Sequence, residues 1–146
     1  MEATWIVVAD AARGRIFEMQ QEGHLAEIEN FVNPAEREDN ADLRTDGYGR
    51  FYGKGEREEG HTAEPSVLPK EHEAARFAKH LAVYLDQARN RHLYDKLRLI
   101  AAPSFLGLLR NTLDDEVRKL VDQELDQDLT KVSVRELEQR LERTSH

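Results

Sequence analysis

Three apolar runs open the chain. The first, at residues 5–9, is continuously apolar and rich in β-branched side chains, which indicates a strand buried on both faces. Gly14 marks a turn into a second apolar run at residues 15–19, and we predict that the two strands form a hairpin. After another turn, a weaker apolar pattern over residues 25–31 predicts a third antiparallel strand.

Helical spacing dominates the second half of the chain. Beyond Pro69, which suits a first helical turn, apolar residues recur on one face to residue 88 and predict the longest helix of the protein. Residues 97–102 predict a central strand that ends at Pro103. Apolar residues at helical spacing over residues 105–117 then predict a second helix.

A short strand and a last helix complete the predicted order. The strand is expected at about residues 120–125, and the helix follows Ser133 and Glu136, whose spacing is that of a capping box. The order β-β-β-α-β-α-β-α predicts a single α/β domain with a mixed sheet covered by helices. It is also the element order of ribonuclease H-like folds.

Between the third strand and the long helix lies a segment with few apolar residues. From about residue 34 to residue 66 the chain carries five of its eight glycines, with acidic residues on both flanks. A segment of this length without an apolar pattern is usually either functional or disordered. We interpret it as a long Gly- and charge-rich loop within one domain spanning residues 1–146.

Composition and charge exclude several classes of function. Charged residues make up 34% of the 146 residues and the net charge is -8, which fits a well-solvated surface and not a broad basic face for duplex DNA. The absence of cysteine excludes a disulfide framework, a thiolate zinc site and a catalytic cysteine. The first residues have neither a basic signal-peptide start nor an apolar run long enough to span a membrane, so we expect a cytoplasmic protein without a membrane partner.

One stretch of the loop is locally basic and aromatic. Residues 44–55 interleave basic and aromatic side chains with glycines, a composition able to contact phosphates and to stack on unpaired bases. The candidate RNA-binding residues are Arg44, Gly47, Tyr48, Gly49, Arg50, Phe51, Tyr52 and Lys54. The alternative is a surface loop whose aromatic side chains pack back onto the domain.

Candidate catalytic groups are few. Asp10, at the end of the first strand, could begin a magnesium site, but a turn residue that accepts backbone hydrogen bonds is the simpler interpretation. Ser104 lies between a strand and a helix without the glycine-flanked elbow of a nucleophile, and we interpret it as a helix cap. No i, i+4 pair of a helical zinc motif occurs among His61, His72, His80 and His92. We therefore expect neither a metal nor a cofactor.

Four stretches together resemble the bacterial host attachment protein family. They are residues 4–10 (TWIVVAD), 46–51 (DGYGRF), 101–110 (AAPSFLGLLR) and 126–131 (DQDLTK), in the family's order and spread over nearly the whole chain. The family takes its name from a phenotype in bacteria that attach to hosts, and it implies no known catalytic mechanism, ligand or set of functional residues. Since we expect no export signal, the resemblance implies an indirect role in attachment and not a surface adhesin.

At fold level, the element order also resembles the middle domain of archaeal and eukaryotic peptide-chain release factors. In those factors the loop between the third strand and the long helix carries Gly-Gly-Gln and enters the ribosomal peptidyl transferase centre. Here residues 47–55 have the sequence GYGRFYGKG, without the glutamine or the glycine pair, which puts peptidyl-tRNA hydrolysis by that mechanism in doubt. The resemblance implies contact with the ribosome or with tRNA.

These observations predict a binding module and not an enzyme, one that contacts RNA in a ribosomal or tRNA context through residues 44–55. Two alternatives stay open. One is a metal-dependent or esterase-like hydrolase centred on Asp10. The other is a regulatory homo-oligomeric interaction protein that uses its charged terminal helix.

Overall fold

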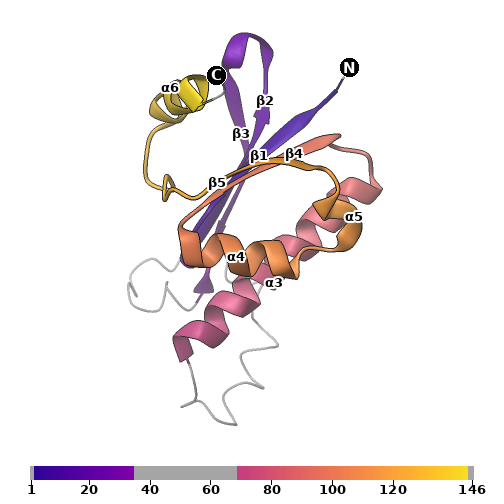
Figure 1. The fold of residues 1–146 in the computed structure, drawn as a ribbon, viewed down its shortest axis with the longest axis vertical. Helices are drawn as coiled ribbons and strands as arrows, with labels where there is room; N and C mark the ends of the chain where they lie inside the picture. The colour runs from indigo at the N-terminus through magenta and orange to yellow at the C-terminus, as the bar shows by residue number, and fades with distance from the viewer. Residues whose placement is uncertain (1, 35–68, 145–146) are drawn as a thin grey trace.

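Three strands, a long helix and then alternating strands and helices make up the domain (Figure 1). The computed structural model describes residues 2–34 and 69–144. The strands are β1 (Thr4–Ala9), β2 (Arg13–Met19), β3 (Leu25–Val32), β4 (Lys96–Ala101) and β5 (Val121–Leu125). The helices of the described residues are α3 (Pro69–Asn90), α4 (Pro103–Thr112), α5 (Asp115–Arg118) and α6 (Val134–Thr144), with a 3-10 turn at Gln21–Gly23.

The first strand, β1, lies at the centre of one mixed sheet with the order β3-β2-β1-β4-β5. It pairs antiparallel with β2 and parallel with β4, so that Val7 lies opposite Ile16 on one side and Leu99 on the other. Every side chain from Ile6 to Ala9 is fully buried, as expected for a strand covered on both faces. The prediction made from this apolar run is confirmed.

Helices cover both faces of the sheet. Because successive side chains of a strand point to opposite faces, Trp5, Val7 and Ala9 pack with residues of α3, α4 and α5. Ile6 and Val8 pack on the other face with residues of α6. The domain therefore has two apolar clusters, one on each side of its central strand.

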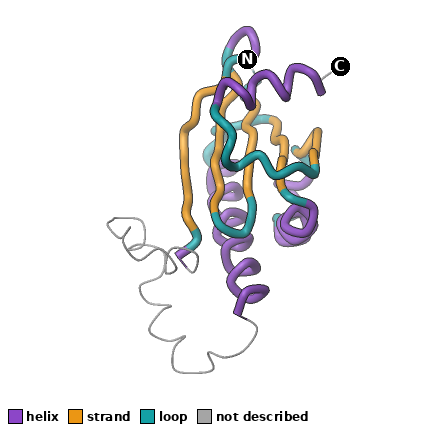
Figure 2. Tube along the Cα trace, turned by 90° about the vertical axis from the view of Figure 1, so that its left-hand side faces the viewer, coloured by secondary structure: helices purple, strands orange, loops and turns teal. Residues whose placement is uncertain are grey.

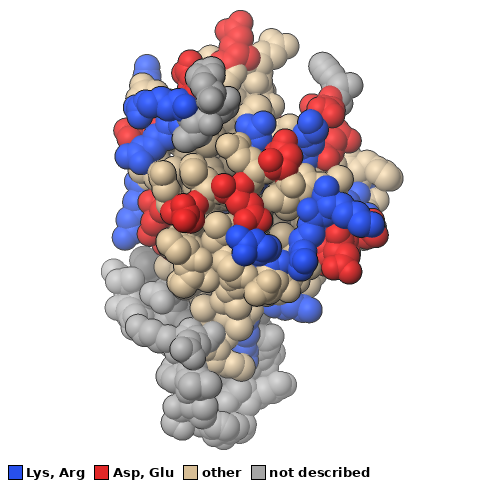
Figure 3. Space-filling view, viewed as in Figure 1, with Lys and Arg blue, Asp and Glu red and all other residues tan. Residues whose placement is uncertain are grey.

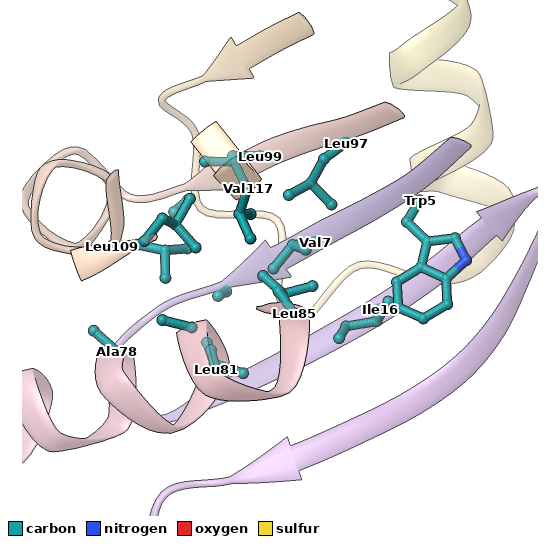
Figure 4. Packing of buried hydrophobic residues seen from close by; sticks show 14 of the residues in the cluster. Trp5, Val7, Ile16, Ala78, Leu81, Leu85, Leu97, Leu99, Leu109 and Val117 are labelled. Atoms are coloured by element: carbon teal, nitrogen blue, oxygen red, sulfur yellow. The ribbon is translucent and has the colours of Figure 1, made fainter. Parts of the chain in front are cut away.

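A glycine in β2 allows α3 to pack directly on the sheet. A Cβ atom at Gly14 would lie 3.1 Å and 3.3 Å from the two terminal methyl carbons of Leu81, closer than ordinary van der Waals contact. Leu81 is fully buried, and Figure 4 shows it projecting from α3 into the cluster that contains Val7 and Leu85. Figure 2 shows α3 running alongside the strands, so this contact is part of a long helix-on-sheet interface.

The predicted single helix over residues 105–117 is wrong, because two helices occupy this stretch. Between α4 and α5 the chain passes through Leu113, whose backbone is extended (φ -66°, ψ 146°). Asp114 then caps α5, since its carboxylate accepts a hydrogen bond from the Glu116 N–H at 3.0 Å. Leu113 and Val117 nevertheless belong to the same buried cluster, which explains why helical spacing continues across the break.

The rest of the predicted order is confirmed, with shifts of one or two residues at the ends of elements. The molecule is a single α/β domain with a mixed five-stranded sheet, while its ribonuclease H-like assignment stays a prediction. Ser133 caps α6 as predicted, because its Oγ accepts a hydrogen bond from the Glu136 N–H at 3.1 Å. The interpretation of Ser104 as a cap is wrong, because α4 begins at Pro103 and Ala102 occupies the N-cap position.

Candidate functional site

A pocket of about 560 Å³ lies beside the carboxyl ends of the parallel strands β1 and β4. The turn after β1, the first turns of α3 and the start of α4 contribute to its lining. The described lining residues are Asp10, Ala11, Ala12, Ala74, Ala102, Ser104, Phe105 and Leu108. The chain after β1 continues to β2, and the chain after β4 continues to β5, so the two connections lead to opposite edges of the sheet. In α/β sheets, such a point of divergence beyond the carboxyl ends of strands is a common ligand site.

Asp10 combines a place in the pocket lining with a structural role. Its Oδ1 accepts hydrogen bonds from the N–H groups of Ala12 at 2.8 Å and Arg13 at 2.9 Å, which fixes the tight turn between β1 and β2. Its Oδ2 accepts a hydrogen bond from the Thr130 hydroxyl at 3.1 Å. The predicted turn role of Asp10 is therefore confirmed, and the structure adds a partner from the far end of the chain.

Thr130 connects this turn to the segment before α6. The residue is 1% exposed, and its hydroxyl lies 3.1 Å from Asp10 Oδ2 and 3.0 Å from Asp128 Oδ1. A hydroxyl has one proton, so it can donate to only one of the two carboxylates at a time. Sequence reasoning gave Thr130 no role, because nothing in a local pattern links two residues so far apart.

Arg15 holds the same segment against β2. Its guanidinium donates hydrogen bonds to the carbonyl oxygens of Thr130 at 3.1 Å and Val132 at 2.8 Å. It also binds the Glu27 carboxylate with Nε at 3.1 Å and with the second terminal nitrogen at 3.2 Å. These hydrogen bonds, more than any other contact, hold the pKa of Glu27 below its ordinary value. Arg15 thus fixes the backbone that presents Thr130 to Asp10.

Asn33 ties the two described parts of the chain together near the pocket. Its backbone N–H donates to the Ala12 carbonyl at 2.9 Å and its side-chain amide donates to the Ala11 carbonyl at 2.9 Å. The same amide nitrogen lies 3.4 Å from the carbonyl oxygen of Glu73, next to the pocket residue Ala74. The chain therefore leaves the described domain and re-enters it beside the pocket.

The predicted site residues have different outcomes. Residues Arg44 to Lys54 lie outside the described residues, so their assignment to RNA binding stays a prediction. Within the described ranges, no group of three or more His, Asp or Glu side chains is placed to hold a metal ion. Asp122 of β5 forms an ion pair with Arg98 of β4 at 3.3 Å.

The alanines that make room for the pocket had no distinguishing pattern in the sequence. Ala11 and Ala12 lie in the turn after β1, Ala74 lies in α3 and Ala102 precedes α4. Each fits a turn or a helix equally well, so only the folded arrangement shows that they surround one space. In the part of the chain that the structure describes, no helix has the length and apolar character needed to cross a membrane.

The sheet, its helices on both faces and this pocket define a single-domain α/β protein with a candidate ligand site at the carboxyl edge of its sheet. The chain belongs to the family described as "Protein required for attachment to host cells", which it matches over residues 5–141. Three of the stretches that carried the resemblance meet at Asp10. It ends the first of them, shares the pocket lining with the residues of the third and accepts a hydrogen bond from Thr130 in the fourth.

Among the solved structures that are similar is an archaeal protein, at 12% sequence identity with a TM-score of 0.43. The match covers 98% of this chain and 39% of that one, so the chain spans about two fifths of the length of the archaeal protein. No curated protein matches the chain at a significant level.

Proposed function

We propose that this member of the host attachment family is a noncatalytic module that binds unpaired RNA in a ribosomal or tRNA context, using residues 44–55. A cytoplasmic location is part of the proposal, because ribosomes and tRNA are there. The role in attachment that the family description gives is then indirect.

The observation that carries the proposal is the closure of the chain at Asn33. Hydrogen bonds from Asn33 to the turn after β1 and to the start of α3 fix both ends of the stretch that contains residues 44–55. The chain that leads to and from its basic and aromatic residues therefore leaves and re-enters the domain beside the pocket. Basic side chains with interleaved aromatic ones are typical of surfaces that bind single-stranded nucleic acid.

The distribution of charge on the protein supports a local contact with nucleic acid and not a broad one. The chain has a net charge of -8, and Figure 3 shows acidic and basic side chains intermixed over the face in view. A broad single-sign face would be needed to follow a duplex backbone. A short basic stretch suits an unpaired strand or a loop of structured RNA.

The test is co-sedimentation of the protein with ribosomes and RNA from lysate at low and moderate salt. The wild type should sediment with RNA, and the variant Arg44→Ala/Arg50→Ala/Lys54→Ala should be retained about tenfold less, with a weaker salt dependence, because three phosphate contacts are lost. The matched control removes as many exposed positive charges elsewhere, as Lys119→Ala/Arg135→Ala/Arg143→Ala, and should behave like the wild type. Equal retention of both triple variants would contradict the proposal.

A hydrolase is the second candidate, because Asp10 and Ser104 line the same pocket. A metal-dependent reaction would need Asp10 to bind the ion with the one coordination position that its turn contacts leave open. The test is the melting temperature with and without Mg²⁺ or Mn²⁺. An increase that disappears in Asp10→Asn would support this candidate, and no metal effect would remove its main support.

A further inference from the structure

We propose that the pocket at the carboxyl edge of β1 and β4 binds a single nucleobase through its hydrogen-bonding edge. The inference rests on the proposed function only for the source of the base, which is an unpaired nucleotide of RNA. The residues from which we infer it all lie in the described parts of the chain.

The size and walls of the pocket suit a flat ring. Its volume of about 560 Å³ lies within the range of small-molecule sites, which is roughly 300–1,000 Å³. Its walls are largely apolar, with Ala74 contributed by α3 and Phe105 and Leu108 by α4. The small alanine side chains leave the pocket wide enough for a ring, and the larger side chains supply apolar surface against which its faces can pack.

Asp10, which directly follows β1, gives the pocket a hydrogen-bond acceptor. A carboxylate has about four lone-pair positions, and Asp10 uses two on Oδ1 for backbone N–H groups and one on Oδ2 when the Thr130 hydroxyl donates to it and not to Asp128. One position on Oδ2 remains, which can accept from an exocyclic amino group. The turn contacts hold the carboxylate in place, so binding does not need to order it.

Hydrogen-bond donors follow the neighbouring strand β4, at the same edge of the sheet as Asp10. Ser104 contributes a hydroxyl to the lining, and it lies in the first turn of α4. The first turn of a helix has N–H groups without an intrahelical acceptor. At the N-cap position stands Ala102, which has no side-chain acceptor for them. An acceptor beside donors matches the edge of a base that carries an amino group next to a ring nitrogen or carbonyl oxygen.

The charge of the pocket favours the base over the phosphate of a nucleotide. Among the described lining residues the one charged side chain is Asp10, and it is negative. A phosphate in the same space would be repelled by it, whereas a neutral base edge with an amino donor is attracted. Phosphates of the same nucleotide then remain outside the pocket.

The experiment titrates the four nucleosides, one at a time, into isotope-labelled full-length protein and follows amide signals by NMR. We expect saturable shifts at Ala12, Ser104 and Phe105 for at least one nucleoside with an amino group, namely adenosine, guanosine or cytidine, and weaker shifts with uridine. In Ala74→Leu, which fills the pocket, affinity should fall at least tenfold. The matched control Ala75→Leu places the same side chain at the neighbouring exposed position and should bind as the wild type does.

Absence of saturable shifts for all four nucleosides, or equal affinity of Ala74→Leu and the wild type, would overturn the inference. A parallel titration with a single-stranded oligoribonucleotide identifies the source of the base. Tighter binding of the oligonucleotide that depends on Arg44, Arg50 and Lys54 would assign the pocket to RNA. Equal affinity for nucleoside and oligonucleotide would keep the pocket assignment for a free nucleoside while contradicting the proposed function.

Discussion

At the scale of the residue, Asp10 is the point where the turn, the pocket and the last third of the chain meet. Removing its carboxylate in Asp10→Ala deletes two backbone hydrogen bonds of the turn and one from Thr130. We expect a loss of about 2 kcal/mol in the free energy of unfolding, because hydrogen bonds to a charged group contribute more than neutral ones. Urea denaturation followed by circular dichroism measures it.

Two further variants separate the contributions of Asp10. Asp10→Asn keeps one oxygen for the turn but replaces the other with an N–H₂ group, so we expect roughly half of the loss. Asp126→Ala, at an exposed position outside these contacts, should change the free energy of unfolding by less than about 0.5 kcal/mol. Stability of Asp10→Ala equal to the wild type would show that the turn does not depend on this carboxylate.

Asp10 and Thr130 also show what a sequence can specify at this scale. An aspartate between a strand and a following turn predicts its own backbone contacts, because those partners lie two and three residues away. The Thr130 hydroxyl is 120 residues away, and no local pattern encodes that distance. The turn could therefore be predicted, whereas the tie to the far segment could not.

At the scale of the element, the interface between α3 and the sheet depends on Gly14. In Gly14→Val the new side chain would collide with Leu81, since even a Cβ atom lies 3.1 Å from its nearest methyl carbon. We expect Gly14→Val to lower the free energy of unfolding by about 2 kcal/mol. The same change should lower it by less in a protein that already carries Leu81→Ala, because that variant lacks the obstructing methyl groups. Unfolding of the four proteins of this double-mutant cycle measures the coupling.

The comparison within the same protein is Gly107, which lies in α4 and has no atom within 4 Å of its position for a Cβ atom. Gly107→Ala should stabilise the protein by about 0.5–1 kcal/mol, because alanine is the better helix former. Additive effects of Gly14→Val and Leu81→Ala on the free energy of unfolding would instead show that the whole helix α3 moves to make room for the valine. The close contact between Gly14 and Leu81 would then not limit the packing of α3 on the sheet.

Elements could be predicted from the sequence better than their ends. The apolar spacing that continues from Leu109 through Leu113 to Val117 reflects burial in one cluster, and burial does not require one continuous helix. The break depends on the cap that Asp114 provides for α5. Since aspartate is acceptable both at an N-cap and on an exposed helix face, the spacing alone could not distinguish one helix from two.

At the scale of the whole molecule, two clusters on opposite faces of β1 should unfold together. Leu137 of α6 is fully buried in one cluster, and Trp5, the only tryptophan, is buried in the other. We expect Leu137→Ala to lose about 2–4 kcal/mol and to shift the unfolding curves of Trp5 fluorescence and of far-ultraviolet circular dichroism equally. A fluorescence transition that stays in place while the circular dichroism transition moves would show that the two layers unfold separately.

The overall architecture could be predicted from the sequence because apolar residues recur in each strand and helix with the spacing typical of that element. What the sequence did not contain is which strands are neighbours: β1 pairs with β4 across the whole length of α3 and the segment before it. The pocket depends on that pairing, since Asp10 and Ala102 become neighbours of one space only when β1 and β4 lie side by side. A candidate site formed by such a pairing could not be predicted from spacing.

The closure of the chain at Asn33 makes the domain a natural host for insertions. Hydrogen bonds within the described residues already fix the points where residues 35–68 begin and end. For a stretch with both ends fixed, doubling its length changes the free energy of closure by only about 0.6 kcal/mol. The insert can therefore be lengthened, shortened or exchanged over generations, or by an engineer, while the sheet and its helices keep their stability. The fold and the stretch that joins these two points can therefore evolve separately.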